Sequence, residues 1–132
     1  MSALKNNNAF TLIEFVVSVL ILTVGLLGLL QTINTAISNN MGNTLRNEAT
    51  VVADEQLSSR IAQLSTSNST GFTSANTSLK VSRKIHNGFK NYSVVRTEVS
   101  TGSGSLEVNV LISWKHKNNR YTHNAASVVS KR

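Results

Sequence analysis

The chain has 132 residues, no cysteine, no proline and a formal net charge of +7. The lack of cysteine excludes disulfides and thiolate metal sites, and the length allows one small domain beside a long helix. The surplus of lysine and arginine favours acidic partners, such as nucleic acid, anionic lipid or an acidic protein surface.

The first residues, Met1–Ala9, form a short polar leader with one basic residue, Lys5. No other basic residue occurs before Arg46. Because cytoplasmic flanks of membrane spans are enriched in Lys and Arg, this bias predicts a cytoplasmic N-terminus and an external remainder.

An apolar stretch follows from Phe10 to Leu30 and contains one charged residue, Glu14. As a helix it would be about 31 Å long, roughly the thickness of the hydrocarbon core of a bilayer. A carboxylate at the membrane centre costs about 2.5–3.5 kcal/mol, so such residues usually have a partner and a function. A secretory signal fits poorly, because its apolar core is shorter and a small-residue cleavage motif follows it. A plain membrane anchor would leave the position of Glu14 unexplained.

Beyond Leu30, apolar residues recur every three to five positions as far as Leu64. This pattern predicts an amphipathic helix that continues from the apolar stretch, about 80 Å long in total. Ser38–Asn43 is its weakest part, because poor helix formers cluster there with Gly42, and one glycine costs about 1 kcal/mol relative to alanine. We expect local melting or a bend at this segment. Residues 65–76 are rich in Ser, Thr and Asn and predict a loop.

The C-terminal part has the period-two pattern of β-strands. We expect four antiparallel strands, over residues 79–86, 89–100, 106–114 and 121–129. Asn87-Gly88 predicts the first hairpin turn, and Thr101–Gly104 and Lys117–Arg120 predict the next two. One face of such a sheet must be buried, and the helix from about Ala49 to Leu64 is available to cover it.

The expected fold class is therefore α+β, with a long N-terminal helix packed on a small antiparallel four-stranded sheet. The expected organisation is a leader (1–9), a membrane or filament-core helix (10–30), an amphipathic helix half (31–65) and a β domain (66–132).

The sequence Ala9-Phe10-Thr11-Leu12-Ile13-Glu14, followed by an apolar helix, resembles the N-terminus of type IV prepilins and type II secretion pseudopilins. The resemblance implies a type IV pilin-like fold, cleavage between Ala9 and Phe10 by a prepilin peptidase, and methylation of the new Phe10 amine. The family prefers glycine where this chain has Ala9.

Three further segments resemble PilV-type minor pilins: the run Ile21–Leu30 with its Val24–Leu29 core, the alanine-bearing segment Arg46–Ile61, and the V-x-V-x-I-x-W pattern from Val108 to Trp114. The resemblance implies a minor subunit of a type IV pilus that assembles into the filament or primes its assembly. Its partners would be other major and minor pilins, the peptidase and the inner-membrane assembly platform. The subunit would span the inner membrane once, with a periplasmic C-terminal domain, before it joins the pilus. An I-type pseudopilin of type II secretion is the neighbouring alternative.

Glu14 has a physical role under this resemblance. An unpaired carboxylate is costly in hydrocarbon, so pairing with the cationic Phe10 amine of another subunit would favour docking in register. The alternative is that Glu14 only reaches to the lipid headgroups.

No catalytic constellation is present, and we predict no enzyme activity, cofactor or metal. Asp54 is far in sequence from His86, His116 and His123, and the histidines lack the spacing of metal ligands. Trp114 is expected in the core.

Basic residues surround two of the predicted turns, close to Phe89, Tyr92 and Tyr121. Phosphate neutralisation and aromatic stacking by such a surface would suit a DNA-uptake pilin, whereas a solvated face or a contact to an acidic subunit needs no DNA. The candidate nucleic-acid or acidic-partner contacts are Lys80, Arg83, Lys84, Lys90, Lys115, Lys117 and Arg120.

Overall fold

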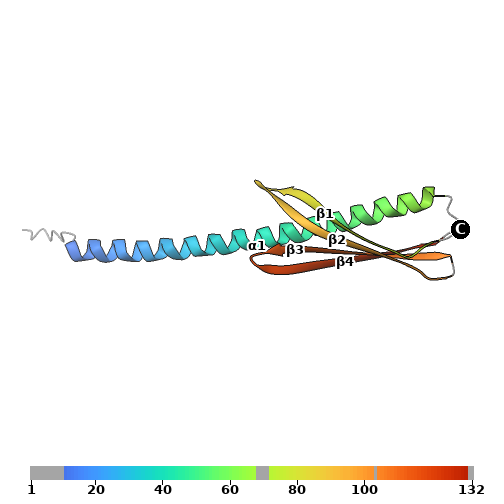
Figure 1. Cartoon of the computed structure of the whole chain (residues 1–132). Helices are drawn as coiled ribbons and strands as arrows, with labels where there is room; N and C mark the ends of the chain where they lie inside the picture. The colour runs from blue at the N-terminus through green and yellow to red at the C-terminus, as the bar shows by residue number, and fades with distance from the viewer. Residues whose placement is uncertain (1–10, 68–71, 103, 131–132) are drawn as a thin grey trace, which may run out of the picture. The chain divides into compact units, whose positions relative to one another are not determined.

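The computed structural model describes residues 11–67, 72–102 and 104–130. Helix α1 (Leu12–Thr66) is followed by four strands, β1 (Ala75–Ile85), β2 (Gly88–Ser100), β3 (Ser105–His116) and β4 (Asn119–Ser130). The strands form one antiparallel sheet in the order β1-β2-β3-β4 (Figure 1). The predicted fold class is confirmed, because the long helix and the sheet share one apolar core.

The chain divides into two compact units, Met1–Asn40 and Met41–Arg132. In the first unit, the large apolar side chains of α1 from Leu12 to Leu30 are exposed, and this part of the helix is long and apolar enough to cross a membrane. The hydroxyls of Ser18 and Thr23 donate hydrogen bonds to the carbonyl oxygens of Glu14 and Val19, each at 2.7 Å. Both side chains are therefore satisfied inside the helix, as a hydrocarbon environment requires.

The segment Ser38–Asn43 is helical throughout, so the expected local melting is wrong. Met41 packs on the edge of the core and Leu45 is fully buried, one on each side of Gly42. The gain from burying these side chains exceeds the cost of about 1 kcal/mol that glycine adds to a helix.

In the second unit, one face of α1 covers the sheet. Leu45, Ala49, Val52, Ala53 and Leu57 are buried, a spacing that places them on one side of a helix. The part of the helix that covers the sheet begins at Leu45, one helical turn before the predicted Ala49. The alternating apolar residues of β3 all face this core, as predicted; they are Leu106, Val108, Val110, Ile112 and Trp114.

The first hairpin turn lies one residue earlier than predicted. Its central residues are His86 and Asn87, with Ile85 paired to Gly88 and His86 at a positive φ of 52°. In this register Val81 lies opposite Tyr92 and Leu79 opposite Val94. A turn centred on Asn87-Gly88 would place Arg83 opposite Tyr92 instead. The observed turn therefore pairs apolar side chains with each other across the strands, which stabilises the sheet.

The other two turns lie close to their predicted positions. Lys117 and Asn118, both with positive φ, form a two-residue turn between β3 and β4 of the kind that suits the twist of a hairpin. Gly102 and Gly104, with φ of 71° and 75°, provide the left-handed conformations between β2 and β3.

The buried face of β2 carries charged side chains as well as apolar ones. Glu98 is 2% exposed and accepts two hydrogen bonds of 2.7 Å from Arg60 of α1, one from Nε and one from Nη2. Arg96 Nε lies 2.9 Å from the same carboxylate. Hydrogen bonding to Glu98 raises the pKa of Arg60 above its usual value. The bidentate pair fixes the C-terminal part of α1 against the C-terminal end of β2, an inner strand of the sheet.

We expect Glu98→Gln to lower the free energy of unfolding by about 3 kcal/mol, because it leaves Arg60 and Arg96 beside a neutral side chain in a buried site. Urea unfolding of the full chain in detergent micelles, followed by the fluorescence of Trp114, measures this. Glu107→Gln is the matched control, since Glu107 lies on the opposite face of the sheet and should change stability by less than about 0.5 kcal/mol. Equal effects of the two substitutions would contradict a structural role for the buried pair.

At the other end of the sheet, Tyr92 connects β2 to the helix. Its side chain is fully buried, and its hydroxyl donates a 3.1 Å hydrogen bond to the carbonyl oxygen of Leu45. Burial, with a smaller contribution from the negative charge of Glu48, raises the pKa of Tyr92 to about 12. The phenol therefore stays neutral in the folded protein at pH values where the unfolded chain begins to ionise it.

A raised folded-state pKa predicts stability that is complete below pH 10 and is lost as pH rises towards about 12. Tyr92→Phe removes this titration and the hydrogen bond to Leu45. We expect the variant to be about 1 kcal/mol less stable at neutral pH and to lose less stability than the wild type above pH 10. Unfolding free energies across this range test the point, and parallel curves for the two proteins would refute it.

Candidate functional site

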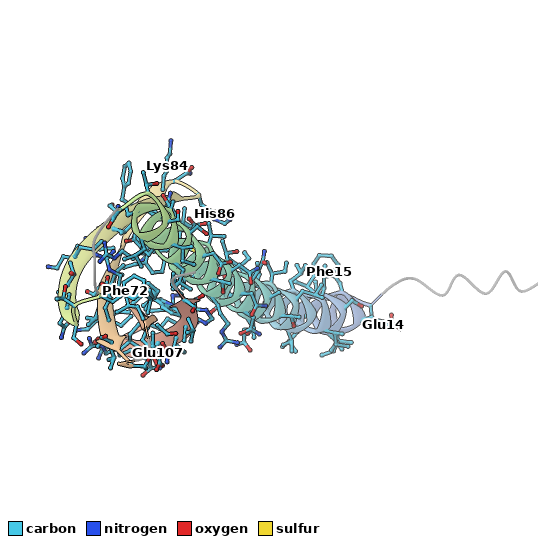
Figure 2. All side chains as sticks on the ribbon, turned by 90° about the vertical axis from the view of Figure 1, so that its right-hand side faces the viewer. Glu14, Phe15, Phe72, Lys84, His86 and Glu107 are labelled. Carbon is cyan, nitrogen blue, oxygen red and sulfur yellow. The ribbon has the colours of Figure 1, made fainter. Side chains whose placement is uncertain are left out.

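Glu14 lies in the first turn of α1, at the start of the apolar stretch (Figure 2). Its Oε2 accepts hydrogen bonds from the backbone N–H of Thr11 at 2.9 Å and from the Thr11 hydroxyl at 3.1 Å. The backbone N–H of Glu14 in turn donates to Thr11 Oγ1 at 3.3 Å. This reciprocal arrangement is a capping box, which satisfies N–H groups that a helix start otherwise leaves without partners.

The sequence analysis did not identify this cap, although Thr11-Leu12-Ile13-Glu14 has the Thr-x-x-Glu spacing that indicates one. The cap does not depend on cleavage after Ala9, because the Thr11 N–H belongs to the Phe10–Thr11 peptide bond on the mature side of that position. The predicted cleavage and methylation residues, Ala9 and Phe10, lie outside the described residues.

The structure places most of the predicted basic contacts at one end of the second unit. The β1–β2 and β3–β4 turns both lie at this end, and the β2–β3 turn lies at the other (Figure 1). Lys80 and Lys84 are on β1, Lys90 on β2, Lys115 on β3, Lys117 in the last turn and Arg120 on β4. We call this the hairpin end. Lys84 points away from the helix (Figure 2).

Arg83 differs from the other predicted contacts because it faces α1. Its Nε lies 3.5 Å from Oε1 of Glu48, and its Nη2 forms an ion pair with the carboxylate of Glu55. The two glutamates are two helical turns apart, so the guanidinium lies between them. Arg83 is thus a structural contact between β1 and the helix, with its charge balanced.

A shallow hollow of about 460 Å³ lies among the remaining cations at the hairpin end. Arg120 Nη2 donates a 3.2 Å hydrogen bond to Ser113 Oγ, which holds the guanidinium beside this hollow. The lining combines cations with hydroxyl, amide and aromatic groups, a set suited to an anionic group; it comprises Lys80, Phe89, Lys90, Asn91, Ser93, Ser113, Trp114, Lys115 and Arg120.

Most aromatic side chains near these cations belong to the core. Trp114 lies between Tyr92 and Tyr121, with ring centroids 5.9 Å from each, and is 6% exposed, as predicted for a core residue. Phe89 is the exception, with 72% of its surface exposed.

Within the described ranges, no group of three His, Asp or Glu side chains is placed to bind a metal ion. His86 is in the first turn, His116 ends β3 and His123 is on β4.

Residues 4–30 match the protein family described as the prokaryotic N-terminal methylation motif. The match supports a type IV prepilin-like protein. It covers residues 4–10, the capping box and the apolar part of α1. The helix on an antiparallel sheet is a type IV pilin-like arrangement. A protein of this kind is a pilin or pseudopilin that is processed by a prepilin peptidase, is anchored in a membrane before assembly, and assembles with other pilins. No curated protein and no solved structure matches the chain.

Proposed function

We propose that this protein is a minor pilin of a type IV pilus, a structural subunit without catalytic activity that assembles into the filament or primes its assembly. The observation that carries the proposal is the N-terminal methylation motif on a capped apolar helix whose only acid within residues 11–30 is Glu14. The resemblance of Val24–Leu29 and of the Val108–Trp114 strand to PilV-type minor pilins favours the pilus over type II secretion. Loss of pili, rather than of protein secretion, on deletion of the gene would separate the two systems.

In this proposal the prepilin peptidase cuts between Ala9 and Phe10, and the Phe10 amine is methylated. Before assembly the chain spans the inner membrane, with the second unit in the periplasm. The assembly platform then transfers it to the pilus on the cell surface.

The capping box gives Glu14 two separable roles. Its hydrogen bonds to Thr11 use Oε2, so Oε1 can approach the Phe10 amine of a neighbouring subunit. The cap needs only an oxygen acceptor, which glutamine also provides, whereas the contact with an ammonium in hydrocarbon needs the negative charge.

We expect Glu14→Gln to insert into the membrane normally, to keep the helix start and to enter filaments much less than the wild type. Fractionation of membranes and sheared pili, with quantification of the subunit in each, measures both steps. Glu14→Ala removes the cap as well as the charge and serves as the comparison. Wild-type incorporation of Glu14→Gln would show that the cap is the only function of this residue.

Cleavage is tested by mass spectrometry of the N-terminus in cells with and without prepilin peptidase. We expect a mature chain that begins at methylated Phe10 only in cells with the enzyme. Ala9→Gly should increase the processed fraction, because the family prefers glycine at this position. A chain that still begins at Met1 in a strain that processes its other prepilins would overturn the assignment.

A further inference from the structure

We propose that the hairpin end of the sheet binds the anionic phospholipid headgroups of the membrane in which the chain is anchored, and so holds the second unit at the membrane surface until the subunit is extracted. The proposal requires only that the apolar part of α1 is in a membrane. It does not depend on which secretion or pilus system uses the subunit.

The first observation is the position of the cations along the second unit. Tyr92 bonds to Leu45, and Glu98, further along β2, bonds to Arg60, further along α1, so this strand and the helix run in the same direction. The strand residues between Tyr92 and the first turn therefore extend back from Leu45 towards Met41, where the unit begins. Ten residues separate Leu30 from Met41, and as a helix they would rise about 15 Å. Headgroup layers extend about 5–7 Å beyond the hydrocarbon, and the Debye length is about 8 Å at physiological salt. The chain is therefore short enough to keep these cations within reach of a charged surface.

The second observation is charge asymmetry. No ion pair joins Lys80, Lys84, Lys90, Lys115 or Arg120 to a carboxylate of the described residues, whereas Arg60, Arg83 and Arg96 are paired with glutamates. The three arginines that contact glutamates are thus neutralised, whereas these five cations at the hairpin end form no such pair. Lys80, Lys115 and Arg120 all line the hollow at the hairpin end. Several positive donors around one hollow are what the phosphodiester of a lipid headgroup needs to bind.

The third observation is the exposed aromatic ring at the same end. Phe89 is directly opposite Lys84 in the β1–β2 pairing and is the most exposed large apolar residue of the sheet. A solvated face gains nothing from such a residue. An aromatic side chain flanked by lysines is typical of protein surfaces that enter the headgroup layer.

The same chemistry could also bind the phosphodiesters of DNA, but the structure favours the membrane. DNA binding by stacking needs several exposed rings along a basic track. Here Tyr92 is fully buried, Trp114 and Tyr121 stack on each other, and the charge of Arg83 is balanced by Glu48 and Glu55. Among the described residues of the strands, the cations without an ion pair lie towards one end of the sheet rather than along a groove.

The test uses the full chain in lipid nanodiscs. Because the chain has no cysteine, Asn119→Cys, at the hairpin end, and Val128→Cys, towards the opposite end of β4, each accept a single fluorescent label. Quenching by headgroup-labelled lipid reports proximity to the surface. Discs of phosphatidylcholine alone are compared with discs that also contain phosphatidylglycerol.

We expect the label at position 119 to be quenched much more in phosphatidylglycerol discs than in neutral discs, and the label at position 128 to respond little. Each lysine near an anionic surface contributes about fivefold to binding, so Lys84→Gln with Lys115→Gln should weaken the contact by more than about tenfold. About 1 M salt should abolish it, since the Debye length falls to about 3 Å. Lys131→Gln with Arg132→Gln is the matched control. It removes the same charge immediately after Ser130, which pairs with Ser105 at the opposite end of the sheet, and should leave quenching unchanged.

Equal quenching in the two kinds of disc, or an equal loss with both double variants, would overturn the proposal. A combination of two results would also overturn it. In that combination, a short DNA duplex binds the nanodisc-embedded chain in a way that depends on Lys84 and Lys115, and quenching at position 119 does not depend on phosphatidylglycerol. That result would assign the surface to DNA.

Discussion

The part of α1 from Met41 to Thr66 covers the apolar face of the β-sheet, and the contact between the two is the constraint on which the second unit depends. A sheet of four strands cannot bury an apolar face against itself. The helix supplies Leu45 through Leu57 for that purpose, and two polar contacts fix its position, Tyr92 on the carbonyl of Leu45 and Arg60 on Glu98. The apolar contacts give the larger part of the stability, whereas the polar ones determine which residues of the helix lie over which strand.

The same sheet separates two populations of cations. Arginines that face the helix are paired with glutamates, as Arg83 is with Glu48 and Glu55, and contribute to packing. Five cations at the hairpin end, Lys80, Lys84, Lys90, Lys115 and Arg120, form no ion pair with a carboxylate of the described residues, and they occur with an exposed Phe89. The net charge of +7 does not by itself show where a partner would bind. The arginines that pair with glutamates must first be distinguished from the cations that do not. What remains is a local surface at the end where the chain arrives from its membrane segment, rather than a uniformly basic domain.

At the start of α1, one carboxylate stabilises the first turn of the helix. Glu14 closes a capping box with Thr11, so the N–H groups of these two residues have partners at the helix start even where no water is present. An acid at this position is thus satisfied locally in the isolated subunit. Under the proposed function, its charge also attracts the ammonium group of a neighbouring subunit, so the carboxylate has one partner during membrane insertion and a second when subunits meet.

Much of the fold follows from local patterns in the chain. One long helix and four antiparallel strands could be predicted from the apolar run, the helical spacing to Leu64, the alternation from Leu106 to Trp114 and the turn residues. Each of these patterns depends only on neighbours within a few positions of the chain. Other features depend on contacts between distant segments. Packing against α1 decides which face of β2 is buried, the one with Val94, Arg96 and Glu98, and gives Arg83 its glutamate partners. Pairing with the neighbouring strand sets the turn at His86-Asn87. Packing of Met41 and Leu45 in the core keeps Ser38–Asn43 helical. The pattern of β2 is compatible with either face. Burial of Glu98 becomes favourable because Arg60 of the helix and Arg96 of the same strand both neutralise its carboxylate.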